Sequence, residues 1–554
     1  MVGEQAGMGR ARCRERLRVD EDIGALRGDP TTVWGARMED VRVAGATGPG
    51  WADPGSAEEL GRFAALQEKL EPLARRVLSD PRAPQTVVVV PSLTMDLEEL
   101  AKIPGSHHYE ERLLCMLMLL RLPRTHVVYV TSQNIASAIV DYYLHLLPGI
   151  PLRHARSRMT LLSCHDASDV PLTRKILDRP RLLERIRSAI TDPQAAHMTC
   201  FNSTALERTL AVRLGIPLYG NDPKLNYLGT KSGSREAFRE AGVPLPDGFE
   251  HLRDGDDVCE AVVELKRRRP GLRRAAIKLD EGFSGEGNAV FTYDGSPEGQ
   301  DLARWVREEL PRRIKFESGG ETWERYGQKF EHMGGIVECW LDGDEVRSPS
   351  VQCRINPLGE ATVVSTHDQV LGGPSGQIFL GSTFPADAEY SRDIKEAGDR
   401  VGEVLRERGA LGRFAIDFIS VRRGEGWEHA AIEINLRKGG TTHPYLILRF
   451  LTDGTYDADD GLYCTPTRKP CYYYASDNLK SPAYEGLTPD DLVDIAVDNG
   501  LHFDGASQQG VVFHLIGALS QYGKVGTVCI GDSHENARKY YQDTVAVLDR
   551  EARR

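Results

Sequence analysis

Long apolar runs, paired cysteines and an excess of positive charge are all missing from this sequence of 554 residues. The most apolar stretch, Leu113–Leu120, is too short to cross a bilayer and is typical of a buried helix. The ten cysteines form no CxxC pair, which predicts a reduced protein in which they serve as small apolar residues. A formal net charge of −12 argues against a dedicated nucleic-acid-binding protein. No apolar segment of a secretory signal follows Met1, so we expect a soluble protein of the cytoplasm that has no membrane partner.

The first 55 residues also lack the apolar periodicity of helices and strands, and they contain Gly-Pro-Gly and Asp-Pro-Gly turns. Gly7-Met8-Gly9 does not indicate a dinucleotide-binding fingerprint, because no strand precedes it. We therefore expect residues 1–55 to form a mobile extension. A lid, a partner tether and a dispensable tail all remain open as its role.

Residues 56–225 alternate short apolar runs with segments of helical spacing. Such alternation predicts a parallel, doubly wound α/β sheet. No phosphate-binding glycine turn follows the first run, where Pro91-Ser-Leu-Thr94 stands instead, so this domain need not bind a nucleotide. The expected strands are 86–90, 126–130, 161–164 and 198–201, and the expected helices lie near 109–121, 134–147, 172–190 and 204–213.

Residues 226–455 predict an α+β region in which strands dominate after one short helix from Ser232 to Ala241. Short Gly or Asp turns join many of these strands, which suits antiparallel sheets. We expect one subdomain at 226–335, a second at 336–455, and a small C-terminal domain at 456–554 with a helix near 534–550. The expected strands are 275–279, 289–293, 336–341, 348–354, 361–366, 414–421 and 430–435, with a strand or helix around 510–519.

A glycine-rich loop at Glu281–Asn288 separates two of these expected strands. Its glycines let backbone N–H groups turn toward one anion without interference from a Cβ atom, so a flap over nucleotide phosphates is one interpretation. A hairpin without a ligand is the other, because glycine loops are common. The residues that we expect to contact a nucleotide here are Gly282, Ser284, Gly285, Glu286 and Gly287.

Two lysines stand close to this loop or to the short helix. Lys278 immediately precedes the loop within an apolar strand, where it either faces solvent or reaches phosphate oxygens. Lys231 stands at the start of the helix, where a cation opposes the macrodipole unless an anion lies nearby. An exposed lysine without a function is the alternative interpretation of each.

An acidic group on two apolar strands is the most informative pattern. Glu433 and Asn435 are two residues apart on one strand and therefore project from the same face. Asp417 lies in an otherwise apolar strand, where burial without a partner would be costly. Two carboxylates and an amide oxygen form a hard oxygen set suited to Mg²⁺ that bridges ATP phosphates. A solvated sheet face explains any one of the three, but it explains them together poorly.

Cations and small hydrogen-bond donors follow the second of these strands directly. Beside a bound metal they would suit a carboxylate or an acyl phosphate. The residues that we expect to contact this substrate are Arg437, Lys438, Gly440, Thr441, Thr442 and His443.

A possible hinge lies at Glu338–Glu345, where an apolar strand ends at an acid and a second acid follows a turn. Such a hinge offers backbone groups to adenine and a carboxylate to ribose hydroxyls, although an ordinary strand end has the same pattern. The candidate nucleotide contacts are Glu338, Cys339, Trp340, Leu341 and Glu345.

Taken in order along the chain, these motifs resemble the ATP-grasp superfamily over roughly residues 85–455. That superfamily orders a lysine before a short helix, a lysine with a glycine-rich loop, an acidic hinge, an Asp strand and a Glu-x-Asn-x-Arg strand. Within it, Asn435–Pro444 and the extra C-terminal domain resemble the peptide ligase of pheganomycin-type biosynthesis. The resemblance implies a doubly wound pre-ATP-grasp domain, a lid subdomain at 226–335 and a metal- and nucleotide-binding subdomain at 336–455.

The resemblance also implies an activity. ATP and Mg²⁺ would activate a carboxylic acid as an acyl phosphate, which the amino group of an amino acid or peptide would then attack. Arg437 and Lys278 would be the catalytic residues, and a homodimer is possible by resemblance alone. A phosphotransferase of the same fold and a nucleotide-binding regulatory protein that has lost catalysis are the two alternatives.

Overall fold

The computed structural model describes residues 51–95, 97–101, 103–282, 287–372, 376 and 378–553. All of them belong to the compact unit Arg42–Arg554. Most of the expected mobile extension, residues 1–50, lies outside the described residues. Trp51, near its end, contacts the first domain, since the Cζ atom of Arg213 lies 4.5 Å from the Trp51 ring centroid.

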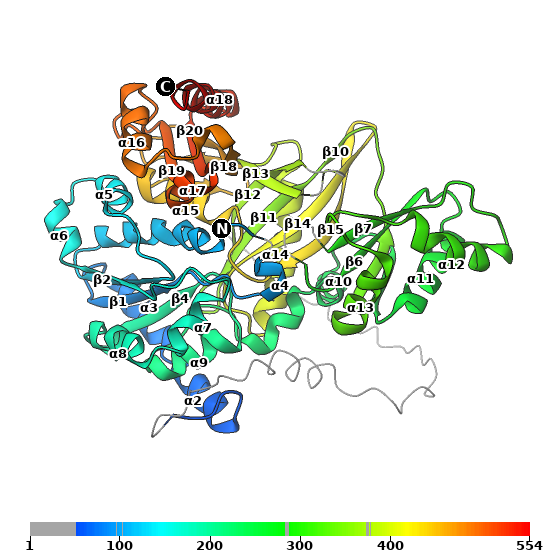
Figure 1. Ribbon diagram of the computed structural model, residues 1–554, viewed down its shortest axis with the longest axis horizontal. Helices are drawn as coiled ribbons and strands as arrows, with labels where there is room; N and C mark the ends of the chain where they lie inside the picture. Colours follow the sequence, from blue (N-terminus) through cyan, green and yellow to red (C-terminus); the bar gives the residue numbers. More distant parts are fainter. Residues whose placement is uncertain are drawn as a thin grey trace, which may run out of the picture. The chain divides into compact units, whose positions relative to one another are not determined.

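A four-stranded parallel sheet with strand order β3-β2-β1-β4 forms the centre of the first domain. Successive strand residues point to opposite faces, so Val87 and Val89 pack in one buried cluster and Val88 and Val90 in another. Helices cover both faces (Figure 1), which confirms the predicted doubly wound sheet. The elements are α2 (Ala57–Gln67), α3 (Leu70–Ser79), β1 (Gln85–Val90), α4 (Leu97–Ala101), η1 (Ser106–Arg121), β2 (Thr125–Thr131), α5 (Ser137–His145), α6 (Leu152–Arg156), β3 (Met159–Ser163), α7 (Leu172–Leu177), α8 (Pro180–Ala189), η2 (Pro193–Ala195), β4 (Ala196–Cys200), α9 (Ala205–Leu214) and η3 (Pro223–Gly229).

A five-stranded antiparallel sheet follows, with strand order β5-β9-β6-β7-β8. Its three packed helices correct the expectation that strands dominate this segment. In α11, for example, Val258, Val262 and Leu265 are buried at helical spacing within a highly charged sequence. The elements are α10 (Lys231–Glu240), β5 (Gly248–Leu252), α11 (Gly255–Arg268), β6 (Arg274–Leu279), β7 (Asn288–Thr292), α12 (Asp301–Arg313), β8 (Lys315–Phe316), α13 (Trp323–Met333) and β9 (Gly335–Cys339).

A nine-stranded sheet lies at the centre of the rest of the described chain, in the order β10-β14-β11-β12-β13-β18-β20-β19 with β15 paired to β14, and β16 and β17 form a separate pair. The strands of the expected C-terminal domain therefore continue the preceding sheet, because β18 pairs with β13. The elements are β10 (Val346–Arg347), β11 (Pro349–Ile355), β12 (Ala361–Gly372), β13 (Ile378–Phe384), α14 (Ser391–Glu407), β14 (Gly412–Arg423), β15 (Gly426–Asn435), α15 (Thr442–Thr452), β16 (Thr455–Asp457), β17 (Leu462–Cys464), β18 (Tyr472–Lys480), η4 (Pro482–Tyr484), α16 (Pro489–Asp498), β19 (Gly510–His514), η5 (Ile516–Ala518), α17 (Leu519–Tyr522), β20 (Lys524–Gly531) and α18 (His534–Glu551).

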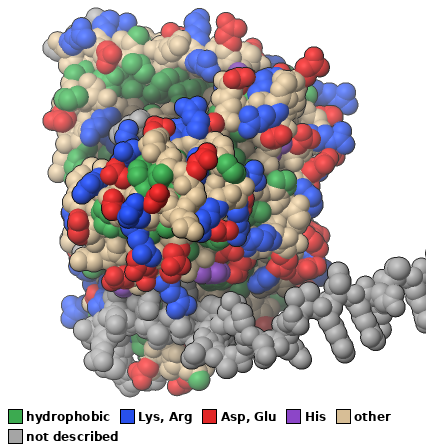
Figure 2. Space-filling model, turned by 90° about the vertical axis from the view of Figure 1, so that its right-hand side faces the viewer, with side chains coloured by type: hydrophobic (Ala, Val, Ile, Leu, Met, Phe, Trp, Pro, Cys, Tyr) green, Lys and Arg blue, Asp and Glu red, His purple; other side chains and the backbone are tan. Residues whose placement is uncertain are grey.

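The described surface matches the mixed composition. Acidic and basic side chains are interspersed on the face that Figure 2 shows, and neither sign gathers into one continuous patch there. Among the described residues, no helix has the length and apolar character needed to cross a membrane.

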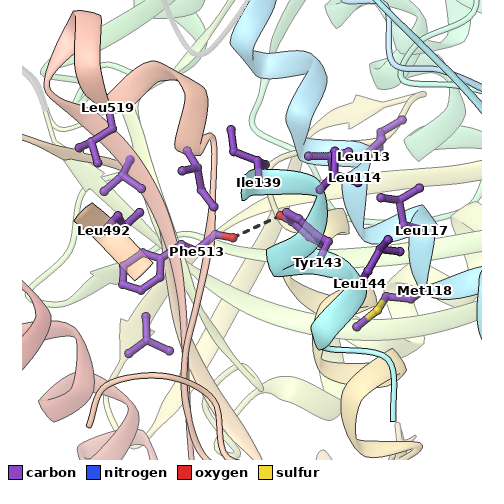
Figure 3. Packing of buried hydrophobic residues seen from close by; sticks show 14 of the residues in the cluster. Leu113, Leu114, Leu117, Met118, Ile139, Tyr143, Leu144, Leu492, Phe513 and Leu519 are labelled. Atoms are coloured by element: carbon purple, nitrogen blue, oxygen red, sulfur yellow. Dashed lines mark hydrogen bonds between the residues drawn. The ribbon is translucent and has the colours of Figure 1, made fainter. Parts of the chain in front are cut away.

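One hydrophobic cluster joins the first domain to the end of the chain. Leu113, Leu114 and Leu117 of η1 lie in the same buried cluster as Phe513 of β19 and Leu519 of α17 (Figure 3). Within it, the Tyr143 hydroxyl donates a hydrogen bond to the carbonyl of Phe513 at 3.3 Å. The two segments are therefore expected to unfold together.

Leu114→Ala should lower the free energy of unfolding by about 3 kcal/mol, because it removes a fully buried side chain from this cluster and leaves a cavity. Denaturant unfolding followed by circular dichroism measures the change. Leu60→Ala is the control, since Leu60 is 45% exposed and its truncation should change stability by less than about 0.5 kcal/mol. Equal effects of the two substitutions would contradict the assignment of this cluster as a shared core.

Candidate active site

A cavity of about 950 Å³ is lined by residues of the five-stranded and nine-stranded sheets and by residues of the first domain that lie outside its strands. Twelve residues that the sequence motifs single out lie together on its wall, although they are spread over 211 positions of the chain. They are Lys231, Lys278, Glu338, Cys339, Trp340, Leu341, Asp417, Glu433, Asn435, Arg437, Gly440 and Thr441.

Both lysines of the sequence analysis are buried and paired with carboxylates. Lys278, on β6, places its Nζ 2.6 Å from Glu338 on the neighbouring strand β9. Lys231, the first residue of α10, places its Nζ 2.6 Å from Glu433, which is the anion that its position at a helix N-terminus requires. The second carboxylate oxygen of Glu338 lies 2.9 Å from the guanidinium of Arg235. Solvent-facing lysines are therefore ruled out at both positions.

The acidic group is assembled by two antiparallel strands. Asp417 on β14 and Glu433 on β15 are direct partners in the register. The Asn435 amide donates to Asp417 at 2.9 Å, and the Gln369 amide donates to the other Asp417 oxygen at 2.8 Å. Burial and the neighbouring charge of Glu433 raise the pKa of Asp417 to about 6. Burial also acts to raise the pKa of Glu433, but Lys231, together with Arg437 and Lys278, outweighs burial and the net pKa is lowered.

These side chains fit a divalent cation. Two carboxylates and an amide are the hard ligands that Mg²⁺ takes in proteins. Burial first, and then the charge of Glu433, raise the pKa of Asp417, so a further cation beside the two acids would stabilise the charged form of Asp417. Asp417, Glu433 and Asn435 are accordingly the described residues on this wall that could hold such an ion.

Residues 338–341 comprise the end of β9 and the two residues after it, and all four line the cavity. The guanidinium of Arg274 lies over the Trp340 ring, with Cζ 4.6 Å from the ring centroid. The structure does not bring Glu345 to the cavity: its carboxylate pairs with Arg347 and Arg422 at the surface. Glu345, the second acid of the expected hinge, therefore forms salt bridges at the sheet edge.

The glycine-rich loop connects β6 to β7, and these strands pair as an antiparallel hairpin. The Leu279 amide donates to the carbonyl of Gly287 at 3.1 Å, which closes the base of the loop. Gly282 and Gly287 do not line the cavity. Ser284, Gly285 and Glu286 lie outside the described residues.

Arg437 and the residues just before α15 form the middle of the cavity wall. Burial lowers the pKa of Arg437, while Glu433 and Asp417 counteract it. Gly439, Gly440 and Thr441 line the cavity at the start of α15, a place where backbone amides and the helix dipole favour an anion. A Cβ atom on Gly440 would lie 2.6 Å from the Phe379 ring, so the close packing there requires glycine.

Three expected substrate contacts lie behind this wall. Lys438 donates to Thr199 at 3.0 Å and to the carbonyl of Cys200, which ties the strand end to the first domain. Thr442 donates to Gln352 at 3.2 Å. His443 lies in a fully buried group with Asp477 and His514. Each of the three therefore supports the cavity wall instead of lining it.

The sequence motifs did not predict the residues that line the cavity beyond Arg437. This end of the cavity is built by side chains from the first domain and from the C-terminal strands, far from the motifs in sequence. Arg112 carries the one usable signal, since it is a charge at the edge of an apolar helical run. The residues are Tyr109, Arg112, Phe201, Asp477, Asn478 and Lys524.

Comparisons with known families agree with this arrangement. The sequence model of the family described as IQCH-like, ATP-grasp matches residues 300–459, and that of the PGM1 C-terminal domain matches residues 491–544. The first of these matches agrees with an ATP-grasp fold.

The L-propargylglycine–L-glutamate ligase of Streptantibioticus cattleyicolor is 32% identical to this chain over 460 residues. The match covers 81% of this chain and 91% of the relative. The chain belongs to the same family, the ATP-dependent carboxylate–amine ligases of the ATP-grasp fold. Membership of this family favours a ligase over both alternatives of the sequence analysis.

Other similarities are lower. IQ motif-containing protein H of Danio rerio is 23% identical over 560 residues, a match that covers 89% of this chain and 51% of that protein. The biotin carboxylase domain of the Hydrogenobacter thermophilus 2-oxoglutarate carboxylase has a TM-score of 0.48 and 14% identity, covering 83% of this chain and 89% of that one. N5-carboxyaminoimidazole synthetase of Staphylococcus aureus has a TM-score of 0.47 and 13% identity, covering 84% and 98%.

Asp417→Asn should raise the stability of the ligand-free protein at pH 7.5 by about 1 kcal/mol, because it removes the repulsion between two facing carboxylates. The gain should shrink toward pH 5. The pKa of Asp417 rises from its ordinary 3.8 to about 6 on folding, so the wild type loses stability as the pH rises through this window and the variant does not. Thermal unfolding at both pH values measures the difference.

Asp344→Asn is the matched control, because Asp344 is an exposed acid in the turn before β10. It should leave the pH dependence of stability unchanged. A pH profile of Asp417→Asn that coincides with that of the wild type would show that the two carboxylates do not repel each other in the folded protein.

Proposed function

We propose that this enzyme joins a carboxylic acid to the amino group of an amino acid or peptide through an acyl phosphate, with release of ADP and phosphate. The observation that carries the proposal is the meeting of Asp417, Glu433 and Arg437 with two buried lysines on one cavity wall. A ligase of this type must bring two anions, a carboxylate and a polyphosphate, into contact. The five side chains supply the cations and the metal ligands for that task.

The nucleotide would lie against the end of β9 and the two lysines. Cys339, Trp340 and Leu341 line the cavity, where their backbone groups would bind adenine, and Lys278 and Lys231 would contact the phosphates. Glu338 holds the Lys278 ammonium in place. The loop 281–288, with Gly282, Ser284, Gly285, Glu286 and Gly287, would close over the phosphates and exclude water.

Asp417, Glu433 and Asn435 would hold Mg²⁺, which offsets phosphate charge when it is bound. Beside it, Arg437 would orient the acid and stabilise the negative charge that develops on the acyl group and the departing phosphate. Gly440 and Thr441 would bind the activated carboxylate through groups at the start of α15. The carboxylate oxygen bonds to the γ-phosphorus as the bond to ADP breaks. The amine nitrogen then bonds to the acyl carbon as phosphate leaves, and the nitrogen gives up one proton to the solvent.

The substrates are proposed to be amino acids or close derivatives. The relative from Streptantibioticus cattleyicolor is named as a ligase of two amino acids, L-propargylglycine and L-glutamate. The sequence motifs also resemble those of a ligase of peptide natural-product biosynthesis. A guanidino acid is the second candidate for the acid. We place the enzyme in the cytoplasm, since nine cysteines of the described residues are free thiols, which suits a reducing compartment.

The first experiment incubates the protein with ATP, Mg²⁺ and pooled amino and guanidino acids, with hydroxylamine as a small nucleophile. We expect acid-dependent ADP release and a hydroxamate, which mass spectrometry identifies. A stable phosphorylated product that needs no amine would instead indicate a phosphotransferase. ADP release that no acid stimulates would oppose the ligase assignment for the acids in the pool.

Glu433→Gln should lower the rate of hydroxamate formation by about 100-fold or more, because it removes a metal ligand and the partner of Lys231. Glu428→Gln is the control on the same strand, since the Glu428 side chain is 73% exposed. It should retain the wild-type rate. Similar rates for Glu433→Gln and the wild type would exclude Glu433 from the reaction.

Lys278→Met should raise KM for ATP by about 10- to 100-fold, which is the loss expected for one charge-assisted hydrogen bond to phosphate. Glu338 keeps its second partner, Arg235, so the substitution leaves no unpaired buried acid. Steady-state kinetics at saturating acid measures the change. An unchanged KM for ATP would place Lys278 away from the nucleotide.

A further inference from the structure

The end of the cavity beyond Arg437 is rich in positive charge. Three cationic side chains line it, namely Arg112 of η1, Arg437 and Lys524 of β20, whereas Asp477 of β18 is the acid there. Arg112 and Arg437 both lie close to the Phe201 ring, with their Cζ atoms 5.8 and 5.9 Å from its centroid. This end is thus continuous with the proposed reaction centre.

Tyr109 lies between two of these cations. The Cζ atom of Arg112 is 4.2 Å from the Tyr109 ring centroid and the Nζ atom of Lys524 is 5.0 Å from it. Lys524 donates a hydrogen bond to the Tyr109 hydroxyl at 2.7 Å. No carboxylate of the described residues lies within ion-pair distance of Lys524. An ammonium has three donors, so two remain for another acceptor in the cavity.

Asp477 does not neutralise this end. One of its oxygens accepts hydrogen bonds from His514 at 2.7 Å and from His443 at 3.1 Å, and the other lies 2.8 Å from an Arg112 nitrogen. The two buried histidines fix Asp477, and Asp477 in turn fixes Arg112. The Nε atom of Arg112 is buried and has no hydrogen-bond partner among the described residues. Asp477 is thus engaged by Arg112 and the histidines, and Lys524 keeps a positive charge that an anionic ligand in the cavity would balance.

We propose that Lys524 and Arg112 bind the carboxylate of the amine substrate, so that the acceptor is an amino acid or peptide with a free carboxylate. This inference rests on the proposed ligase function. An amine substrate that carries its own carboxylate is a hazard for such an enzyme, because that group could take the place of the acid beside the γ-phosphate. A cationic subsite beyond Arg437 holds the second carboxylate away from Asp417 and Glu433 and leaves the amine free to attack.

The C-terminal strands gain a function from this assignment. Lys524 opens β20 and Asp477 lies on β18, so both come from the part of the chain that extends the central sheet. The first domain contributes Tyr109 and Arg112 from η1. The acceptor subsite is complete only when both ends of the chain are folded together.

The test compares acceptors with and without a carboxylate. The acid is first identified with hydroxylamine; amide formation is then measured with the twenty common amino acids and with their α-amides. We expect the wild type to prefer free amino acids, and Lys524→Met to lower kcat/KM for the preferred one by about 10- to 100-fold. The variant should use the matching α-amide as well as the wild type does. Lys524→Arg should restore most of the preference for the carboxylate.

Lys539→Met is the control, because Lys539 is exposed on α18 of the same segment. Hydroxamate formation from the acid in the absence of an acceptor amino acid should be equal in the wild type, Lys524→Met and Lys539→Met, which also shows that the variants are folded. An unchanged ratio of amino acid to amide use in Lys524→Met overturns the inference, as does a wild type that accepts only amines without a carboxylate. Failure of the hydroxylamine reaction in the wild type would instead count against the proposed function itself.

Discussion

The repulsion between Asp417 and Glu433 is the constraint around which the cavity is organised. Two carboxylates that face each other in a sheet need cations close by. Lys231, which precedes both acids in the sequence, and Arg437, which follows them, are those cations. Lys231 is placed by the first turn of α10, and Arg437 by the strand end that Lys438 anchors to the first domain. The acids therefore determine where a short helix, a strand end and a neighbouring domain must meet.

Much of this arrangement could be predicted from the sequence because it depends on local patterns. Alternating apolar runs indicated the parallel sheet of the first domain, and an acid within an apolar strand indicated Asp417. A two-residue spacing placed Glu433 and Asn435 on one face. These signals require only neighbouring residues and the geometry of a single strand.

The remainder depends on contacts that no local pattern carries. Helices α11 to α14 are so rich in Arg and Glu that their narrow apolar stripes are easily overlooked, although Ile394, Ala397 and Val401 are spaced as on a helix. Glu345 has the same local context as a ribose-binding acid, and only the tertiary position of Arg422 shows that it is otherwise engaged. Tyr109, Arg112 and Lys524 meet across more than four hundred residues, a distance at which sequence spacing gives no information.

The pairing of β13 with β18 limits how this enzyme can be divided. Cutting the chain before β18 would expose the backbone N–H and C=O groups of β13 as an open sheet edge, which invites association between molecules. Exchange of C-terminal segments between relatives would also have to preserve this seam, where Gly381 approaches the carbonyl of Ala475 so closely that an added Cβ would lie 2.1 Å from it. New acceptor specificities are therefore better sought by changing side chains around Lys524 than by recombining whole domains.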